Sequence, residues 1–118
     1  MTGKEYLRSL VNVKKDKKKA KKISDIYTNN LPDIIMKIVS NGEKTIFLDN
    51  GIRALSYDEI VDAERDLHVE FGNNGMIPLF DCGENDFIVY HFSNDKWSKF
   101  NIVDKVVFKT REKLEDLV

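Results

Sequence analysis

The chain has 118 residues, 42% of them hydrophobic and 33% charged, with a formal net charge of −1, which indicates one globular domain that buries its own core. A single cysteine excludes an internal disulfide, and no run approaches the roughly 20 apolar residues of a membrane-spanning helix. No secretory signal is visible, so we expect a cytoplasmic protein with no membrane partner.

Positive charge is concentrated at the N-terminus. Residues 1–22 hold nine lysines and arginines against two acids, a net charge of +7, whereas residues 23–118 carry a net charge of −8. We therefore divide the chain into a basic N-terminal helical arm, residues 1–22, and an acidic domain, residues 23–118. Apolar residues within 4–13 predict a short helix with one apolar face. The seven lysines between residues 14 and 22 predict an exposed helix or loop, because like charges repel.

The next segment predicts a helix and a hairpin. Leu-Pro-Asp at residues 31–33 opens the helix, because proline suits the first helical position and an acid suits the first turn. Apolar spacing up to residue 39 continues it, and a following Asn-Gly pair ends it. A strand is expected over residues 44–49, and Asn50-Gly51 predicts a hairpin with residues 52–55.

The C-terminal half predicts a helix and then a run of strands. Ser56 and Glu59 form a capping-box pattern that opens a helix to about residue 69. Thr110 is expected to cap a last helix. Between these helices, turn residues separate strands over residues 77–81, 87–92, 96–101 and 106–108. Strands joined by short turns are antiparallel. The predicted class is α+β: a single domain with a mainly antiparallel sheet of about five or six strands and helices packed on one face.

Residues that could do chemistry do not form a recognisable arrangement. Cys82, His68 and His91 lack the closely spaced pairs of zinc sites, so we expect no metal. Cys82 has Asp81 and Glu84 as neighbours, which raise a thiol pKa and make a poor nucleophile. We interpret this cysteine as structural.

Other catalytic classes are excluded on similar grounds. Acids line the predicted helix over residues 58–66 and the turn at residues 81–86 and could hold magnesium, but no general base or substrate-positioning arginine accompanies them, so we interpret them as solvated faces. Phosphate-cradling glycine loops and the serine-hydrolase elbow are absent from the sequence. We predict that the protein is not an enzyme and has no cofactor.

The ordered set of elements resembles the SUKH superfamily. The resemblance covers residues 23–118 and is carried by the Leu-Pro helix start, the hairpin, the Ser56 helix start, Ile-Pro-Leu-Phe at residues 77–80, an acidic glycine turn, and the apolar strand that follows. The superfamily includes the yeast cell-wall-synthesis regulators Smi and Knr and many bacterial immunity proteins. The resemblance implies a SUKH-like α+β fold. The chain departs from the family pattern in its stretched acidic turn and its lysine-rich arm.

The resemblance also implies a non-enzymatic protein-binding domain. Bacterial members of the superfamily neutralise polymorphic toxins, often nucleases, so the expected partner is a toxin domain. Nuclease active sites are basic, and an acidic surface with aromatic residues complements them and speeds association. Turns of a sheet are where binding residues tend to lie. The candidate partner-binding residues are Asp81, Glu84, Asp86, Asp95, Trp97 and Tyr90.

Two other functions stay open. The yeast members suggest an intracellular regulatory or scaffolding module. The lysines of residues 14–22 suggest a nucleic-acid-associated protein whose binding weakens steeply with salt. No aromatic residue lies among these lysines, which argues against base stacking, so we interpret them first as a solvated face and do not expect nucleic acid as a partner. The sequence does not predict the oligomeric state or name the partner.

Overall fold

The computed structural model describes residues 1–42 and 44–118. In these residues four α-helices and a six-stranded antiparallel sheet form one α+β domain, which confirms the predicted class. The helices are α1 (Gly3–Ser9), α2 (Lys17–Ile26), α3 (Asp33–Ser40) and α4 (Tyr57–Leu67). The strands are β1 (Ile46–Phe47), β2 (Arg53–Ala54), β3 (Met76–Gly83), β4 (Asp86–His91), β5 (Lys96–Asn101) and β6 (Val106–Arg111). Short 3-10 turns lie at Leu10–Asn12, Gly72–Asn74 and Leu114–Asp116.

Side-chain caps set where the helices begin. The Ser56 hydroxyl accepts a hydrogen bond from the Glu59 backbone N–H at 3.2 Å, and the Glu59 carboxylate accepts one from the Ser56 N–H at 3.0 Å, which confirms the predicted capping box of α4. Asp16 caps α2 by accepting from the backbone N–H groups of Lys18 and Lys19. The helix α4 ends at Leu67, slightly before the expected residue 69, because its C-cap His68 has a left-handed backbone (φ 55°).

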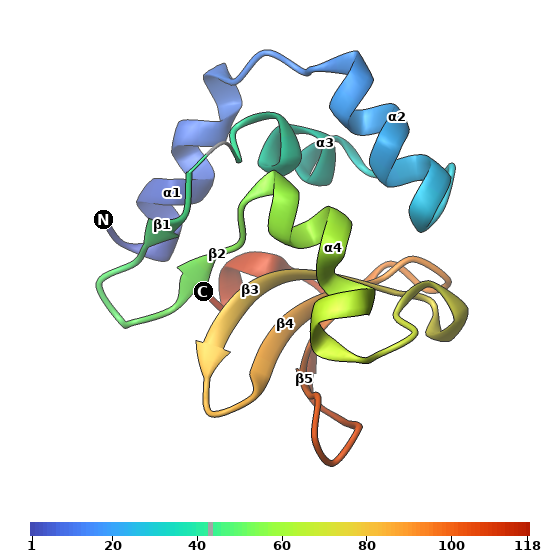
Figure 1. Ribbon diagram of the computed structural model, residues 1–118. Coiled ribbons are helices and arrows are strands. Elements are labelled where there is room, and N and C mark those ends of the chain that lie inside the picture. Colours follow the sequence, from blue (N-terminus) through green and yellow to red (C-terminus); the bar gives the residue numbers. More distant parts are fainter. Residues whose placement is uncertain (43) are drawn as a thin grey trace.

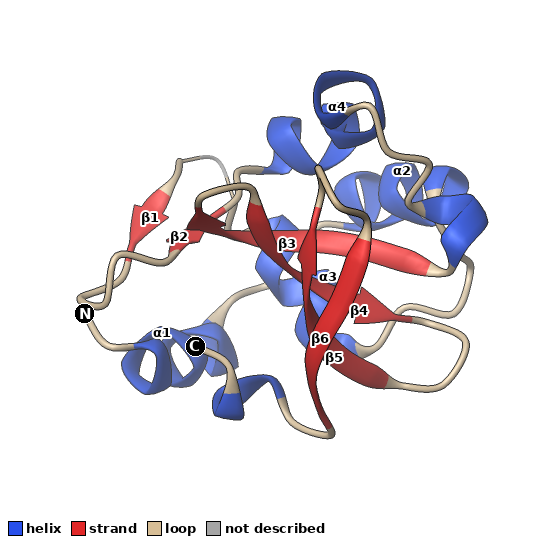
Figure 2. Ribbon diagram, turned by 90° about the horizontal axis from the view of Figure 1, so that it is seen from below, coloured by secondary structure: helices blue, strands red, loops and turns tan. Residues whose placement is uncertain are grey.

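The six strands follow one another across the sheet in chain order, so the sheet is an antiparallel meander (Figures 1 and 2). The hairpin predicted from Asn50-Gly51 joins β1 to β2. The predicted strand at residues 96–101 is β5 with the same bounds. Register shifts interrupt the β3–β4 and β5–β6 ladders. Such irregularities bend a strand and increase its twist.

Both faces of the sheet are covered, so the prediction of helices on one face was wrong. Residues 76–80 of β3 are all buried, although successive side chains of a strand point to opposite faces. On one face the Phe80 ring meets Tyr6 of α1 edge-on, with centroids 5.8 Å apart. On the other face Phe87 lines a groove with Ala63 of α4. The sequence could not show this, because helices distant along the chain supply the second layer.

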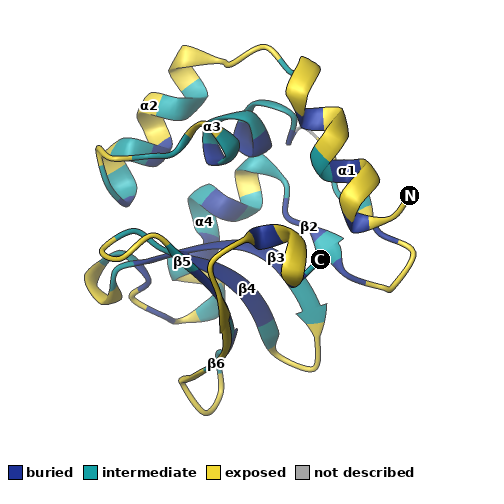
Figure 3. Cartoon of the chain, turned by 180° about the vertical axis from the view of Figure 1, so that it is seen from behind, coloured by how far each residue is buried: buried dark blue, intermediate teal, exposed yellow. Residues whose placement is uncertain are grey.

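The N-terminal residues pack on the domain. Tyr6 and Leu10 are buried in the core, and Gly3 lies so close to the C-terminus that an added Cβ would be 2.5 Å from the Val118 carbonyl carbon. In α2, Ile23 is fully buried, whereas Lys17, Lys18, Lys21 and Lys22 are exposed. Figure 3 shows that the outer side of this helix is largely exposed. Residues 1–22 therefore contribute both to the core and to an exposed basic surface.

The predicted C-terminal helix does not form. Thr110 lies inside β6, and the residues beyond it form only the 3-10 turn Leu114–Asp116. Pairing of Arg111 with Trp97 extends β6 past the expected cap, so Thr110 lies within a strand and not at a helix start. Leu114 and Leu117 are nevertheless buried, so the apolar residues assigned to that helix do face the core.

Candidate functional site

The candidate partner-binding residues lie at two opposite ends of the sheet. In a meander, successive turns alternate between the ends, and the six residues of β4 separate them by roughly 20 Å. The β3–β4 end holds Asp81, Glu84 and Asp86, and the β4–β5 end holds Tyr90, Asp95 and Trp97. The six residues therefore do not form one continuous site.

At the β4–β5 end the two aromatic rings belong to the core. Tyr90 and Trp97 are both buried, with ring centroids 4.6 Å apart. The Tyr90 hydroxyl donates a hydrogen bond to Asp95 at 2.8 Å. Burial, with the Asp95 carboxylate, raises the pKa of Tyr90 to about 12. The rings are not exposed to a partner, and Asp95 fixes the turn by its bond to Tyr90.

At the β3–β4 end, Asp81 takes part in an ion-pair network with residues of neighbouring elements. Arg53 of β2 reaches the Glu59 carboxylate at 2.8 Å with one nitrogen and Asp81 at 3.1 Å with another. Burial alone would raise the pKa of Glu59, but hydrogen bonds from the Ser56 backbone, Arg53 and Thr45 outweigh it and lower that pKa. This network joins β2, β3 and α4 behind the turn.

The β3–β4 turn lies directly beside the β5–β6 turn. The Asn101 amide donates to Asp86 at 2.9 Å, and the Ile102 backbone N–H donates to the Asn85 carbonyl at 2.9 Å. We call residues 83–86 and 101–107 together the twin-turn surface. In Figure 1 the two turns are the hairpin tips at the bottom of the molecule.

The twin-turn surface combines acids with exposed valines. Glu84 and Asp104 are exposed, and neither carboxylate has an ion pair within the described part of the chain. Val103, Val106 and Val107 have 67%, 52% and 43% of their surface exposed. Sequence reasoning missed these valines. The sequence feature that could have predicted exposed valines is the adjacent pair Val106 and Val107 in the last strand. Successive side chains of a strand point to opposite faces, so one of the two must point away from the core.

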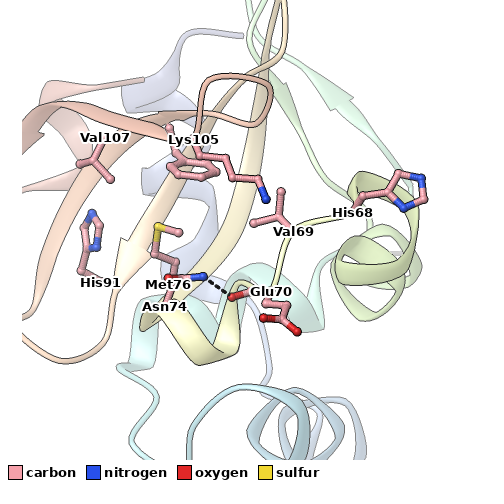
Figure 4. A pocket seen from close by; sticks show the side chains of 9 residues that line it. His68, Val69, Glu70, Asn74, Met76, His91, Lys105 and Val107 are labelled. Atoms are coloured by element: carbon pink, nitrogen blue, oxygen red, sulfur yellow. Dashed lines mark hydrogen bonds between the residues drawn. The ribbon is translucent and has the colours of Figure 1, made fainter.

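A hollow of about 500 Å³ lies beside the twin-turn surface (Figure 4). Buried Met76, Val69 and Phe100 line it, and Lys105 and His91 also border it. Figure 4 shows that the residues lining it come from the end of α4, the following loop, β4 and the β5–β6 hairpin. A concave site with apolar lining and a few polar groups is a common place for a partner side chain to bind.

The histidine of this hollow belongs to a hydrogen-bonded chain across three strands. His91 Nε2 lies 2.7 Å from the Ser98 hydroxyl, which lies 2.9 Å from the Thr110 hydroxyl. Burial lowers the pKa of His91. Ser98 is fully buried and its oxygen has both neighbours as partners, so a substrate carbonyl could not reach it. This serine and histidine do not make a nucleophile.

The described residues provide neither a cluster of metal ligands nor a reactive thiol. Across residues 1–42 and 44–118 no group of three or more His, Cys, Asp or Glu side chains is close enough to hold a metal ion. Cys82 is half-buried, and burial is the main reason that its pKa is raised, with Asp81 and Asp86 adding to the effect. A raised pKa leaves little thiolate at neutral pH.

Comparison of the chain with protein-family models, with curated proteins and with solved structures finds no match. Within the described residues, no helix has both the length and the apolar character to cross a bilayer.

Proposed function

We propose that this chain is a non-enzymatic protein-binding domain of the immunity type, which binds and neutralises a toxin domain, most simply a nuclease, in the bacterial cytoplasm. The observation that carries the proposal is the twin-turn surface, where exposed valines lie among unpaired acids. Apolar side chains supply contact area, and the surrounding carboxylates complement a basic cleft and speed association with it.

The uneven distribution of charge supports this partner class. Residues 23–118, which include the twin-turn surface, carry a net charge of −8, whereas residues 1–22 carry +7. Attraction between this surface and a basic nuclease cleft would raise the association rate at low ionic strength. The SUKH resemblance adds the expectation that the protein partner is a toxin, which charge alone does not specify.

Partner capture followed by an inhibition assay tests the proposal. The full chain, tagged and expressed in its source cell, is used as bait, and captured proteins are identified by mass spectrometry. We expect a basic protein in stoichiometric amount whose purified nuclease activity is lost when an equimolar amount of the chain is added. A captured partner whose activity is unchanged would instead favour the regulatory or scaffolding role. Absence of any stoichiometric protein would overturn the proposal.

A further inference from the structure

The outer side of α2, with Lys14 shortly before it in the chain, carries an exposed lysine surface that the proposed function does not use. We call it the lysine face. Its members are Lys14, Lys17, Lys18, Lys21 and Lys22, and every one of them is exposed. In Figure 3 the outer side of α2 is largely exposed, and in Figure 1 α2 lies at the end of the molecule opposite the twin-turn surface. A ligand on one surface therefore leaves the other accessible.

Helical geometry gathers these charges on one side. Lys17 and Lys21 are four residues apart, as are Lys18 and Lys22, so the two pairs form adjacent rows. At 100° per residue, fully buried Ile23 points in the opposite direction. The packing of Ile23 into the core therefore fixes the lysine face toward solvent.

The acidic body does not neutralise this face. Lys21 pairs with Asp25, one turn along the same helix, at 3.1 Å. Within residues 1–42 and 44–118, the other four members have no ion pair. The neighbouring lysines outside the face behave differently, since Lys15 pairs with Asp33 and Lys19 lies over the Tyr57 ring. Four members of the face are therefore accessible to an external anion.

The position of the charges on α2 adds a second observation. Lys17 and Lys18 occupy the first turn, which holds no acid. The N-terminal end of a helix is its positive end, where lysine opposes helix stability. The Asp16 carboxylate caps the same terminus and offsets one of these charges, so the positive potential of the face comes from its lysines and not from the helix terminus.

The ligand that fits is a polyanion, and the neighbouring residues distinguish three kinds: an anionic membrane, a single-stranded nucleic acid and a duplex. An anionic membrane surface is bound best by helices that also insert apolar side chains, but the apolar residues of α2 face inward: Ile23 is buried and Ile26 is half-buried. Single-stranded nucleic acid is usually held by aromatic stacking, and residues 14–22 contain no aromatic residue. A duplex presents a negative charge about every 1.7 Å of axis and needs only cations.

We propose that the lysine face binds the phosphate backbone of a nucleic-acid duplex without reading its sequence. The contacts are lysine ammonium groups to phosphate oxygens, with no group placed to reach base edges. This function is separate from toxin binding and does not depend on it. This proposal goes beyond the first interpretation of residues 14–22 as a solvated face.

Anisotropy of a fluorescein-labelled DNA duplex of about 20 base pairs, titrated with the full chain, tests the proposal. Contacts with about four phosphates give a slope near −3.6 for log affinity against log salt. We therefore expect the affinity to fall about 150-fold between 50 and 200 mM NaCl. A duplex of different sequence should bind equally well.

Two variants with the same change in charge give the decisive comparison. The first replaces the four unpaired members of the face: Lys14→Gln, Lys17→Gln, Lys18→Gln and Lys22→Gln. The control removes four exposed charges elsewhere: Lys105→Gln, Lys109→Gln, Arg111→Gln and Lys113→Gln. Circular dichroism confirms that each variant is folded.

We expect the first variant to lose at least about tenfold in affinity and most of the salt dependence, and the control to bind as the unmodified chain does. Equal losses in both variants would overturn the proposal, because net charge alone would then explain binding. Absence of duplex binding at 50 mM salt would also overturn it, as would binding to phosphatidylserine vesicles but not to the duplex. Toxin capture is expected to be unchanged in the first variant, so this proposal can fail without the proposed function failing.

Discussion

Replacing Arg53 with methionine should destabilise the domain measurably. Methionine keeps much of the apolar stem of arginine and removes the guanidinium, so the change deletes the ion-pair network rather than the packing. The guanidinium holds Glu59 at 2.8 Å, Asp81 at 3.1 Å and the Thr45 hydroxyl at 3.2 Å. These bonds join β2 to β3 and α4, behind the twin-turn surface.

The expected loss is about 2 kcal/mol. Exposed ion pairs contribute about 0–1 kcal/mol each, and hydrogen bonds to charged groups about 1.5–3 kcal/mol. Arg53 is 23% exposed, which lies between these cases and gives about 1 kcal/mol for each of its two carboxylate partners. Glu59 keeps its bond to the Ser56 N–H, so the loss should not be greater. For a domain of this size, 2 kcal/mol lowers Tm by about 8 °C.

Arg65→Met is the matched control, because Arg65 also pairs with two carboxylates but is 74% exposed. Urea denaturation and a thermal melt of both variants are compared with the unmodified protein. We expect a loss below about 0.5 kcal/mol for the control. If Arg53→Met were no more destabilising than Arg65→Met, the inference that the network supports the sheet end would be refuted.

The ion-pair network around Arg53 also makes the stability of the domain depend on pH. The pKa of Glu59 is lowered in the folded protein, so the folded state binds fewer protons than the unfolded chain does. This stabilisation is present above the unfolded pKa of about 4.3 and is lost as the pH falls through the folded pKa. The difference in stability between the unmodified protein and Arg53→Met should therefore shrink below about pH 4. A constant difference from pH 7 to pH 3 would contradict this reasoning.

Three further substitutions test single contacts by urea denaturation. Tyr27→Phe removes the buried hydrogen bond from the Tyr27 hydroxyl to the Ile60 carbonyl (2.7 Å), and we expect a loss of about 1 kcal/mol; an unchanged midpoint would show that the bond contributes nothing. Gly3→Ala places a Cβ 2.5 Å from the Val118 carbonyl carbon, and we expect a loss of about 1–3 kcal/mol. Deleting Val118 from that variant should recover part of the loss, and no recovery would argue against this contact. Glu84→Gly relieves a left-handed backbone (φ 52°) and should stabilise by about 0.5–1 kcal/mol, so destabilisation would show that the Glu84 side chain has a structural role.

Local signals explain which elements the sequence could predict. The capping box at Ser56 and the turn residues on either side of β5 act within a few residues of themselves, and both elements formed as expected. The predicted C-terminal helix did not form, because a contact with a distant part of the chain determines the structure there. Its expected cap, Thr110, lies in a strand because Arg111 pairs with Trp97, a partner 14 positions earlier in the chain.

In the candidate site, too, the sequence predicted local features and could not predict contacts between distant parts of the chain. The acids at the β3–β4 turn could be listed from the sequence, but their neighbours could not. Val103 and Val106 lie beside that turn because the meander brings two hairpin tips together. Val103 is in the β5–β6 turn and Val106 begins the last strand of the sheet, and both are exposed. Tyr90 and Trp97 were chosen as candidates for a partly exposed aromatic group, yet coverage of both sheet faces buries them.

The affinity of the captured partner for a twin-turn variant is the most direct test of the proposed function. Glu84→Lys with Asp104→Lys reverses the two unpaired acids, and Glu115→Lys with Asp116→Lys makes the same change in charge at exposed residues near the C-terminus. We predict that the first variant binds at least about tenfold more weakly, a loss of about 1.4 kcal/mol, while the second stays within about twofold of the unmodified chain. Equal affinities of the two variants would contradict binding through the twin-turn surface.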